Sequence, residues 1–290
     1  MNFIANAFKL LTTASMIITT STMASEKYLP AALIQLDDYF SHHVIVAEKS
    51  THKLHLYQND NGLPKLIKTY QMATGKKAGD KQFQGDFRTP EGVFRFVNFL
   101  THQDLVTRHG KQGEIYGVGA FVMNYPNPMD YRKKKTGGGI WLHSTNDETR
   151  IEKGLDSRGC LVAHNTDLIE ISKYIELNRT NVLVTHELNF QKESTWKASK
   201  KELKTTIESW LNSWQNEDLK SYVSHYHKEQ YFDKHRGNYS QFRTYKRAVF
   251  NKPGTPLVQI KNLSLLMAND YAVANFIQVY ESNTIKDIGR

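Results

Sequence analysis

Cysteine is almost absent from this chain: Cys160 is the only one among 290 residues. A lone thiol cannot form a disulfide within the chain, so a disulfide-stapled fold is excluded. In an exported protein a free thiol is a liability unless its reactivity is used. We therefore expect Cys160 to have a chemical role.

Long apolar runs are also missing. No segment approaches the ~18 consecutive apolar residues that a transmembrane helix requires. Within residues 1–24, a short and threonine-rich apolar stretch lies between Lys9 and the small residue Ala24. These are the three regions of a secretory signal peptide, so we expect export and cleavage, with no membrane span afterwards. An uncleaved anchor is the alternative.

Acidic side chains are outnumbered by basic ones. Lysine and arginine total 38 against 29 aspartates and glutamates, which leaves a net charge of +9 and favours an anionic partner. Hydrophobic residues at 39% and charged residues at 23% are typical of a soluble globular protein. Export argues against nucleic acid as the partner and leaves the cell wall. The sequence does not indicate an oligomeric state.

A metal-binding signature is lacking as well. Three histidine pairs have spacings that ligands can have, but no third ligand group or HExxH helix accompanies them. These pairs are His42-His43, His52 with His55, and His225 with His227. We expect neither a metal nor another cofactor.

The pattern that is present after residue 42 is that of β-strands. Residues 53–57 alternate in polarity, and 65–72 can return as a hairpin partner beyond a turn at 60–62. Further apolar runs predict a mainly β domain with short helices over 43–190. Before it, Pro30 opens an apolar segment, so a short helical lead-in is predicted within 25–42.

A second unit is expected over 196–290, after a polar linker at 191–194. Ser199 and Glu202 form a capping-box pattern, and apolar residues on one face predict a helix through Trp214. A second helix is predicted near 219–226. Two long strands follow, at 258–267 and 271–280, so this unit is an α+β domain.

The chemistry of Cys160 depends on its neighbours. His143 ends one strand-like run and Cys160 begins another, so adjacent strand ends can bring imidazole and thiol together as base and nucleophile. Gly159 permits a sharp turn that turns backbone N–H groups toward a carbonyl substrate. Arg158 adds positive charge that can receive a carboxylate. An inert, buried cysteine beside a surface histidine would have the same spacing.

Five motifs together resemble the catalytic domain of the L,D-transpeptidases, the YkuD family of bacterial cell-wall enzymes. The resemblance covers about residues 43–187 and rests on the order of the motifs. They are Gly79-Asp80-Lys81, Gly85-Asp86, Thr89-Pro90-Glu91-Gly92, Trp141-Leu142-His143-Ser144 and Ser157-Arg158-Gly159-Cys160.

By position, the resemblance implies a catalytic set of Cys160 as nucleophile, His143 as base and Ser144 as the residue whose backbone carbonyl orients that base. Ser157, Arg158 and Gly159 are then expected to bind substrate or to hold the oxyanion. Arg158 replaces a second histidine of the commoner motif, and Val162 stands where Asn or Arg often follows.

With these two substitutions and its second unit, the chain resembles one branch of the family. Members of that branch have a C-terminal NTF2-like domain, and they include cell-shape L,D-carboxypeptidases. The implied fold is a YkuD-like β-sandwich or barrel with short helices, followed by an α+β NTF2-like domain. Such a domain normally continues past the strand ending near Tyr280 with another strand, so residues 196–290 are expected to form an incomplete version.

The implied reaction is acyl transfer in the periplasm, or cell envelope, of a Gram-negative bacterium. A Cys160 thioester forms at the diaminopimelate–D-Ala bond of peptidoglycan tetrapeptide stems. A second stem then gives a 3–3 cross-link, or water gives a tripeptide. A wall-binding scaffold without turnover is a different hypothesis. A papain-like peptidase fits poorly, because there the cysteine precedes its histidine and heads a long helix.

Overall fold

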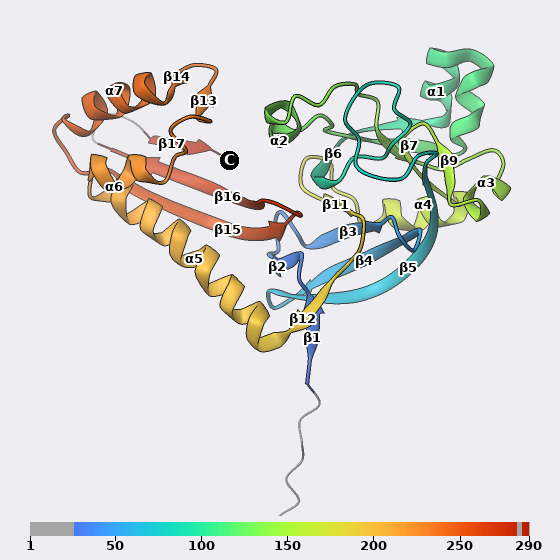
Figure 1. Ribbon diagram of the computed structural model, residues 1–290, viewed down its shortest axis with the longest axis horizontal. Helices are drawn as coiled ribbons and strands as arrows, with labels where there is room; N and C mark the ends of the chain where they lie inside the picture. Colours follow the sequence, from blue (N-terminus) through green and yellow to red (C-terminus); the bar gives the residue numbers. More distant parts are fainter. Residues whose placement is uncertain (1–25, 283–285, 290) are drawn as a thin grey trace, which may run out of the picture.

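The computed structural model describes residues 26–282 and 286–289. The predicted signal segment, residues 1–24, lies outside the described residues. The chain forms two lobes that meet at their bases and diverge above, one built mainly of strands and the other of a sheet with helices (Figure 1). Within the described ranges, no helix is long and apolar enough to cross a membrane.

The first lobe is a closed barrel. Its nine-stranded sheet has the order β10-β8-β7-β6-β11-β3-β4-β5-β9, and β10 also pairs with β5, which closes the ring and leaves β9 outside it. The bounds are β3 (His43–Glu48), β4 (Lys53–Asp60), β5 (Leu63–Gly75), β6 (Gly92–Thr101), β7 (Gly119–Met123), β8 (Trp141–His143), β9 (Leu155–Ser157), β10 (Leu161–Ala163) and β11 (Asn181–Thr185). Closure removes exposed strand edges, and it confirms the predicted mainly β fold.

Alternating side chains fill the barrel, as the sequence pattern of β4 predicts. Leu54 and Leu56 of this strand are at most 1% exposed, whereas His55 between them is half-buried. Phe94 and Leu142 reach the same core from other strands and are equally buried. Each such side chain contributes roughly 1.5–3 kcal/mol through burial, which fixes the strands that carry the candidate site.

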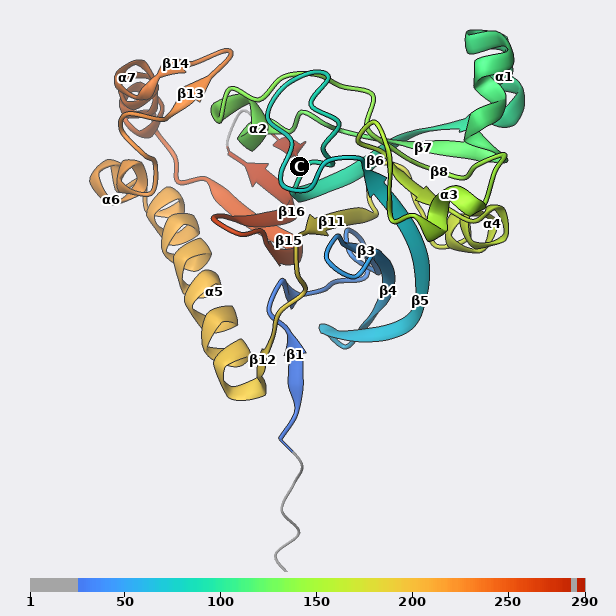
Figure 2. The same ribbon diagram turned by 45° about the vertical axis from the view of Figure 1, so that its right-hand side comes forward.

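Short helices surround the barrel, and α1 projects from its far end (Figure 2). Thr101 and Asn127 cap two of these helices through reciprocal bonds with Asp104 and Asp130. The helices are α1 (His102–His109), the 3₁₀ helix η1 (Gly110–Tyr116), α2 (Pro128–Arg132), α3 (Thr149–Glu152) and α4 (Asn165–Ser172).

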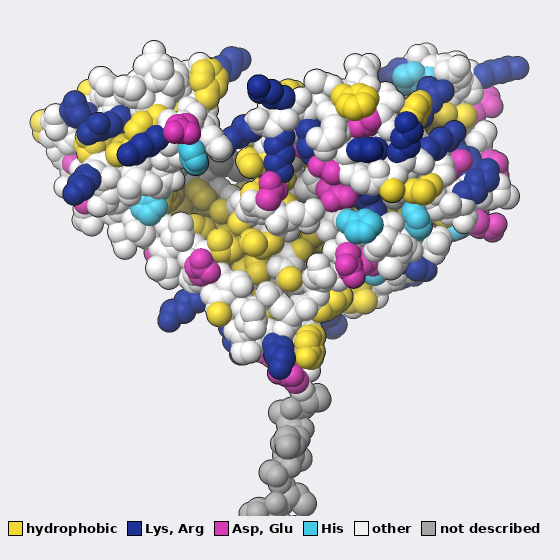
Figure 3. Space-filling model, in the orientation of Figure 1, with side chains coloured by type: hydrophobic (Ala, Val, Ile, Leu, Met, Phe, Trp, Pro, Cys, Tyr) yellow, Lys and Arg dark blue, Asp and Glu magenta, His cyan; other side chains and the backbone are white. Residues whose placement is uncertain are grey.

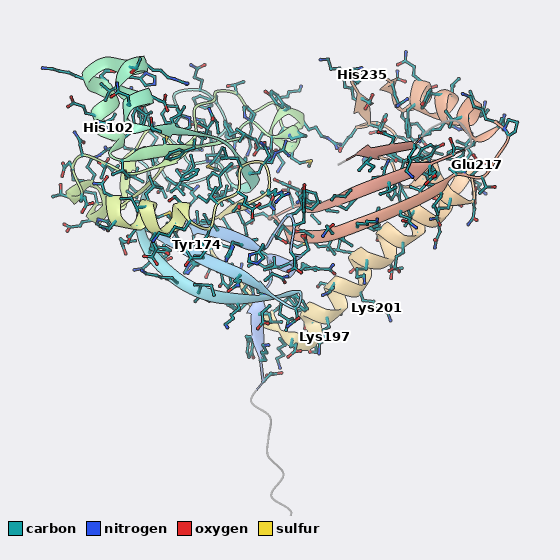
Figure 4. The ribbon with its side chains drawn as sticks, turned by 180° about the vertical axis from the view of Figure 1, so that it is seen from behind. His102, Tyr174, Lys197, Lys201, Glu217 and His235 are labelled. Carbon is teal, nitrogen blue, oxygen red and sulfur yellow. The ribbon has the colours of Figure 1, made fainter. Side chains whose placement is uncertain are left out.

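The second lobe is a four-stranded sheet of order β17-β16-β15-β2 with helices on it, which confirms the predicted α+β fold. Its elements are α5 (Glu193–Gln215), α6 (Leu219–Ser224), the hairpin β13 (Phe232–Asp233) and β14 (Gly237–Asn238), α7 (Tyr239–Phe250), β15 (Leu257–Met267), β16 (Ala272–Glu281) and β17 (Lys286–Gly289). Viewed from behind, Lys197 and Lys201 point into solvent from α5 (Figure 4).

The helical lead-in predicted within 25–42 is wrong. This segment forms two short strands, β1 (Tyr28–Pro30) and β2 (Leu33–Gln35). β1 pairs with β12 (Phe190–Lys192), and β2 pairs with β15 in the sheet of the second lobe. Strand pairing with distant segments buries Leu33 and Ile34 almost completely, and the local apolar pattern does not reveal those partners.

Two predictions at the other end also differ from the structure. The linker expected at 191–194 is the end of β12 and the start of α5, which begins before the capping box at Ser199. The absence of a strand after Tyr280 is contradicted by β17, which pairs antiparallel with residues 278–281 of β16.

Candidate active site

Two parallel strands bring the candidate base and nucleophile to one place. β8 and β10 lie side by side, with Leu142 opposite Leu161 and His143 opposite Val162. His143 is the last residue of β8, whereas Cys160 immediately precedes the first residue of β10. In parallel strands these two positions lie at opposite ends. Because each strand is only three residues long, these opposite strand ends still line one cavity.

His143 is held in one orientation and one tautomer. Its side chain is buried, and its Nδ1 lies 2.5 Å from the backbone oxygen of Ser144. A carbonyl oxygen only accepts, so Nδ1 carries the proton and Nε2 keeps a free lone pair. Burial lowers the pKa of His143 to about 4, although the bond to Ser144 opposes this shift. At pH 7 the ring is a neutral proton acceptor.

Ser144 also fixes the loop in front of the histidine. Its fully buried hydroxyl accepts from the Val118 N–H at 2.8 Å and lies 3.3 Å from the Tyr116 carbonyl oxygen. The Tyr116 ring then meets the His143 ring edge-on, with centroids 4.9 Å apart. The role predicted for the Ser144 carbonyl has the required geometry, and its hydroxyl adds a second positioning contact.

The turn before Cys160 is organised by Ser157. The Ser157 hydroxyl accepts from the Gly159 N–H at 3.0 Å and donates to the Cys160 carbonyl oxygen at 2.7 Å. Gly159 has φ of 129°, and a Cβ there would lie 2.8 Å from the Arg88 oxygen. Since its N–H already has an acceptor, Gly159 serves the site through backbone shape rather than as a free oxyanion donor.

Cys160 is half-buried at the wall of the cavity. Its sulfur donates to the Gly139 carbonyl oxygen at 3.5 Å. Burial raises the pKa of the thiol to about 11, and the charges of Arg150 and Lys81 reduce this effect only in part. At pH 7 the thiol of Cys160 and the imidazole of His143 are therefore both neutral.

The cavity itself measures about 480 Å³ and is lined by both His143 and Cys160. Arg158 is exposed at its wall. Sequence reasoning missed two further lining residues, Arg150 and Asp156, whose side chains pair at 2.6 Å. The only sign of their role in the sequence was that two opposite charges lie between the motifs at 141–144 and 157–160. With Lys76 also present, the cavity carries excess positive charge that suits a carboxylate-bearing substrate.

The remaining sequence motifs form a loop that packs against the turn at residues 157–160. Lys49 donates to the Thr89 carbonyl oxygen and to Glu91, each at 2.9 Å. Lys81 pairs with Asp86 at 2.7 Å, and both side chains are 4% exposed. Burial would raise the pKa of Asp86, but Lys81 and several backbone N–H groups lower it to about 2. These contacts hold the loop whose Arg88 carbonyl lies against Gly159.

The pairs His42-His43, His52 with His55, and His225 with His227, from which no metal site was expected, all lie in the described ranges 26–282 and 286–289. There, no group of three or more His, Cys, Asp or Glu side chains gathers in a geometry that could hold a metal ion.

Comparisons with known proteins agree with this arrangement of barrel, site and second lobe. The L,D-transpeptidase catalytic domain model (YkuD) matches residues 42–184. The model of the Cds6 C-terminal NTF2-like domain matches residues 202–290. No curated protein matches the sequence.

Among the solved structures similar to this chain, two match it over both lobes. Bd1075 of Bdellovibrio bacteriovorus is 30% identical, with 91% of each chain covered and a TM-score of 0.78. The helical cell shape determining protein Pgp2 of Campylobacter jejuni is 21% identical, with 89% of this chain and 88% of that chain covered and a TM-score of 0.70.

Fold and comparisons thus define a strand-barrel domain of the L,D-transpeptidase type with an accessory NTF2-like domain. The chain belongs to the YkuD family of L,D-transpeptidase catalytic domains, in a form that also carries a Cds6-type NTF2-like domain. Membership in this family supports a peptidoglycan-modifying activity.

Proposed function

We propose that this protein is an exported cysteine acyltransferase that cleaves the diaminopimelate–D-Ala bond of peptidoglycan tetrapeptide stems. The observation that carries the proposal is the shared cavity of Cys160 and His143, in which the Ser144 carbonyl fixes the histidine tautomer. Without that tautomer, Nε2 would have no lone pair for the thiol proton.

Acylation begins with attack of the Cys160 sulfur on the stem carbonyl. The thiol proton passes to His143 Nε2 as the carbon–sulfur bond forms, and the carbonyl oxygen takes up negative charge. Because the Gly159 N–H is bonded to Ser157, the oxyanion must be held by other donors at the turn. Collapse breaks the bond to the D-Ala nitrogen, which receives the proton from His143 and leaves as an amine.

The resulting thioester has two possible acceptors. His143 removes a proton from either an amine of a second stem or a water molecule, and that nucleophile replaces the sulfur. The amine gives a 3–3 cross-link, and water gives a tripeptide. The proton returns to the sulfur in both cases. One acyl-enzyme therefore serves both outcomes, and access to the cavity decides between them.

Trimming to the tripeptide, an L,D-carboxypeptidase activity used in cell-shape control, is the second candidate. Arg158 lies exposed at the cavity wall where the commoner motif has histidine. The likeness to Pgp2, described as a helical cell shape determining protein, extends through both lobes. Both features support trimming, whereas the catalytic family as a whole is named for transpeptidation.

The place of action is the periplasm or cell envelope. The substrate class of the family, peptidoglycan, lies outside the cytoplasmic membrane, and residues 1–24 have the pattern of an export signal. Glycan strands and stem peptides are the expected partners, and the net charge of +9 suits their carboxylates.

Covalent trapping tests the nucleophile. A carbapenem, which resembles an acyl donor, should add its mass once to the wild-type protein and not to Cys160→Ala. The His143→Gln variant should react at least ~100-fold more slowly because it lacks the base. A full-mass adduct on Cys160→Ala would show that the nucleophile is another residue.

Product analysis tests the reaction itself. Purified tetrapeptide muropeptides are incubated with the protein and resolved by mass spectrometry. Release of D-Ala with tripeptide alone indicates hydrolysis, and a 3–3 dimer indicates cross-linking. Binding of the muropeptides without D-Ala release would instead support a scaffold that lacks turnover.

A further inference from the structure

A second cavity lies where the two lobes face each other, and Figure 3 shows the surface hollowed between them. This interlobe cavity has a volume of about 360 Å³. Residues 93–95 of β6 and Asn127 line it from the barrel, and residues 271–275 line it from the second lobe. It shares no lining residue with the cavity of Cys160, so it is a separate candidate site.

One wall of the interlobe cavity is a strand edge. β17 pairs only with residues 278–281 of β16, and β15 lies on the opposite side of that strand. Residues 272–277 of β16 therefore have one edge, on the side where β17 lies further along, that pairs with no strand among the described residues. Backbone groups along such an edge can pair with an extended peptide, which is a known mode of peptide recognition.

Two buried donors that line this cavity, one from each lobe, lack acceptors. Within the described ranges, Arg95 Nε and Asn275 Nδ2 have no hydrogen-bond partner, although both atoms are buried. The two residues also line a neighbouring cavity of about 440 Å³, so they lie together. Buried N–H groups are normally bonded, and a ligand that carries acceptor oxygens would satisfy them.

The charge of the cavity selects the kind of acceptor. In the described part of the chain, no Asp or Glu lines either cavity, so no carboxylate neutralises Arg95 there. The other polar groups are already engaged: Asn124 Oδ1 accepts from the Arg95 backbone N–H at 2.8 Å, and Asn127 Nδ2 donates to the Val93 carbonyl oxygen at 3.1 Å. A surplus of donors and a guanidinium whose Nε lacks an acceptor suit a carboxylate.

We propose that the interlobe cavity binds the free C-terminal carboxylate of an extended peptide, with the carboxylate on Arg95 and Asn275 and the peptide backbone along the edge of β16. Phe94, Met129 and Val273 supply apolar walls for the last side chain. The volume suits one or two residues. The inference does not rest on the reaction of Cys160.

The test compares N-acetyl-trialanine, which has a free carboxylate, with its C-terminal amide. Binding is followed by the NMR signals of the Arg95 Nε–H and the Asn275 side-chain amide in the full chain. The acid should shift both signals saturably, and the amide should bind at least tenfold more weakly. Arg95→Gln should weaken binding of the acid at least tenfold.

Arg243→Gln is the matched control, because Arg243 is exposed on α7. It should bind the acid as the wild type does. Thermal unfolding and carbapenem acylation of Cys160 should be unchanged in Arg95→Gln, which separates failure of this site from failure of the proposed function. Equal binding of acid and amide, unchanged binding by Arg95→Gln, or shifts confined to the Cys160 cavity would overturn the proposal.

Discussion

At the scale of single residues, the candidate site combines a neutral thiol and a neutral imidazole in one cavity. Burial shifts the pKa of Cys160 upward and that of His143 downward, so an ion pair is disfavoured before substrate arrives. The cavity thus differs from cysteine sites in which a neighbouring cation maintains a thiolate. The sequence predicted both residues but contained no information on the direction of either shift.

The two pKa values predict an unusually wide pH range for acylation. The rate of carbapenem acylation should stay level from about pH 5 to 9, because His143 remains neutral above its pKa of about 4 and Cys160 remains protonated below about 11. Below pH 5 the rate should fall as the histidine takes up a proton. Stopped-flow or mass-resolved acylation rates measure this profile.

A solvent-exposed histidine would give a different pH profile, because its pKa is about 6.5. An acid limb with its midpoint near pH 6.5 would contradict the buried, neutral state of His143. The His143→Gln variant provides the control, because its residual rate should have no acid limb at pH 4 to 7.

At the scale of elements, the segment α1–η1 packs closely against the residue that follows β8, and Gly117 makes this contact possible. Gly117 has φ of 60°, and a Cβ there would lie 2.4 Å from Ser144 Oγ and 2.5 Å from Asn165 Oδ1. Ser144 in turn orients His143 through its carbonyl oxygen. Close approach at Gly117 therefore connects the loop to His143 through Ser144.

Substitution at this glycine should disturb catalysis as well as stability. Gly117→Ala should lower the free energy of unfolding by ~1–3 kcal/mol and slow acylation of Cys160, because the new methyl group displaces Ser144. Gly110→Ala is a matched control: its φ is 59°, and nothing lies within 4 Å of its Cβ position. It should show the backbone strain alone, with a normal acylation rate.

Thermal unfolding and acylation kinetics on both variants separate the two effects. Equal acylation rates for Gly117→Ala and Gly110→Ala would contradict the proposal that packing at Gly117 affects the position of His143.

Elements also show where local patterns mislead. The capping box at Ser199 predicts a helix start, yet α5 begins at Glu193. The earlier start places Trp196 in a buried position, 1% exposed, with its Nε1–H donating to the Leu33 carbonyl oxygen at 3.0 Å. Burial of a large ring against a distant strand outweighs a local cap worth ~1 kcal/mol.

At the scale of the whole molecule, the two lobes are joined by more than the chain between them. β2 precedes the barrel in sequence but extends the sheet of the second lobe. Trp196, Leu29, Ile34 and Leu265 form one buried cluster from three separate parts of the chain. We therefore expect the lobes to unfold together.

Removal of the tryptophan at this junction should destabilise both lobes. Trp196→Ala should lower the free energy of unfolding by ~3–5 kcal/mol through the cavity that it leaves. Trp196→Phe keeps most of the ring but leaves the Leu33 oxygen without its donor, so a loss of ~1–3 kcal/mol is expected. Carbapenem acylation capacity reports the barrel during heating. Fluorescence of Trp210 and Trp214 reports the second lobe, provided that every protein compared carries Trp141→Phe, because Trp141 lies in β8 of the barrel.

Both signals should disappear at one lower temperature in Trp196→Ala. Loss of the fluorescence signal alone, with acylation capacity kept to the wild-type temperature, would mean that the lobes are independent.

The sequence by itself determined the mainly β class of the first lobe, the α+β class of the second and the family, because alternation and ordered motifs are local properties of the chain. Only the tertiary structure decided that residues 28–30 and 33–35 are strands, that β17 extends the sheet, that the Gly159 N–H is engaged, and that Arg150 and Asp156 line the cavity. Each of these depends on a partner far away in sequence, or on burial that shifts a proton equilibrium, and neither is set by neighbouring residues alone.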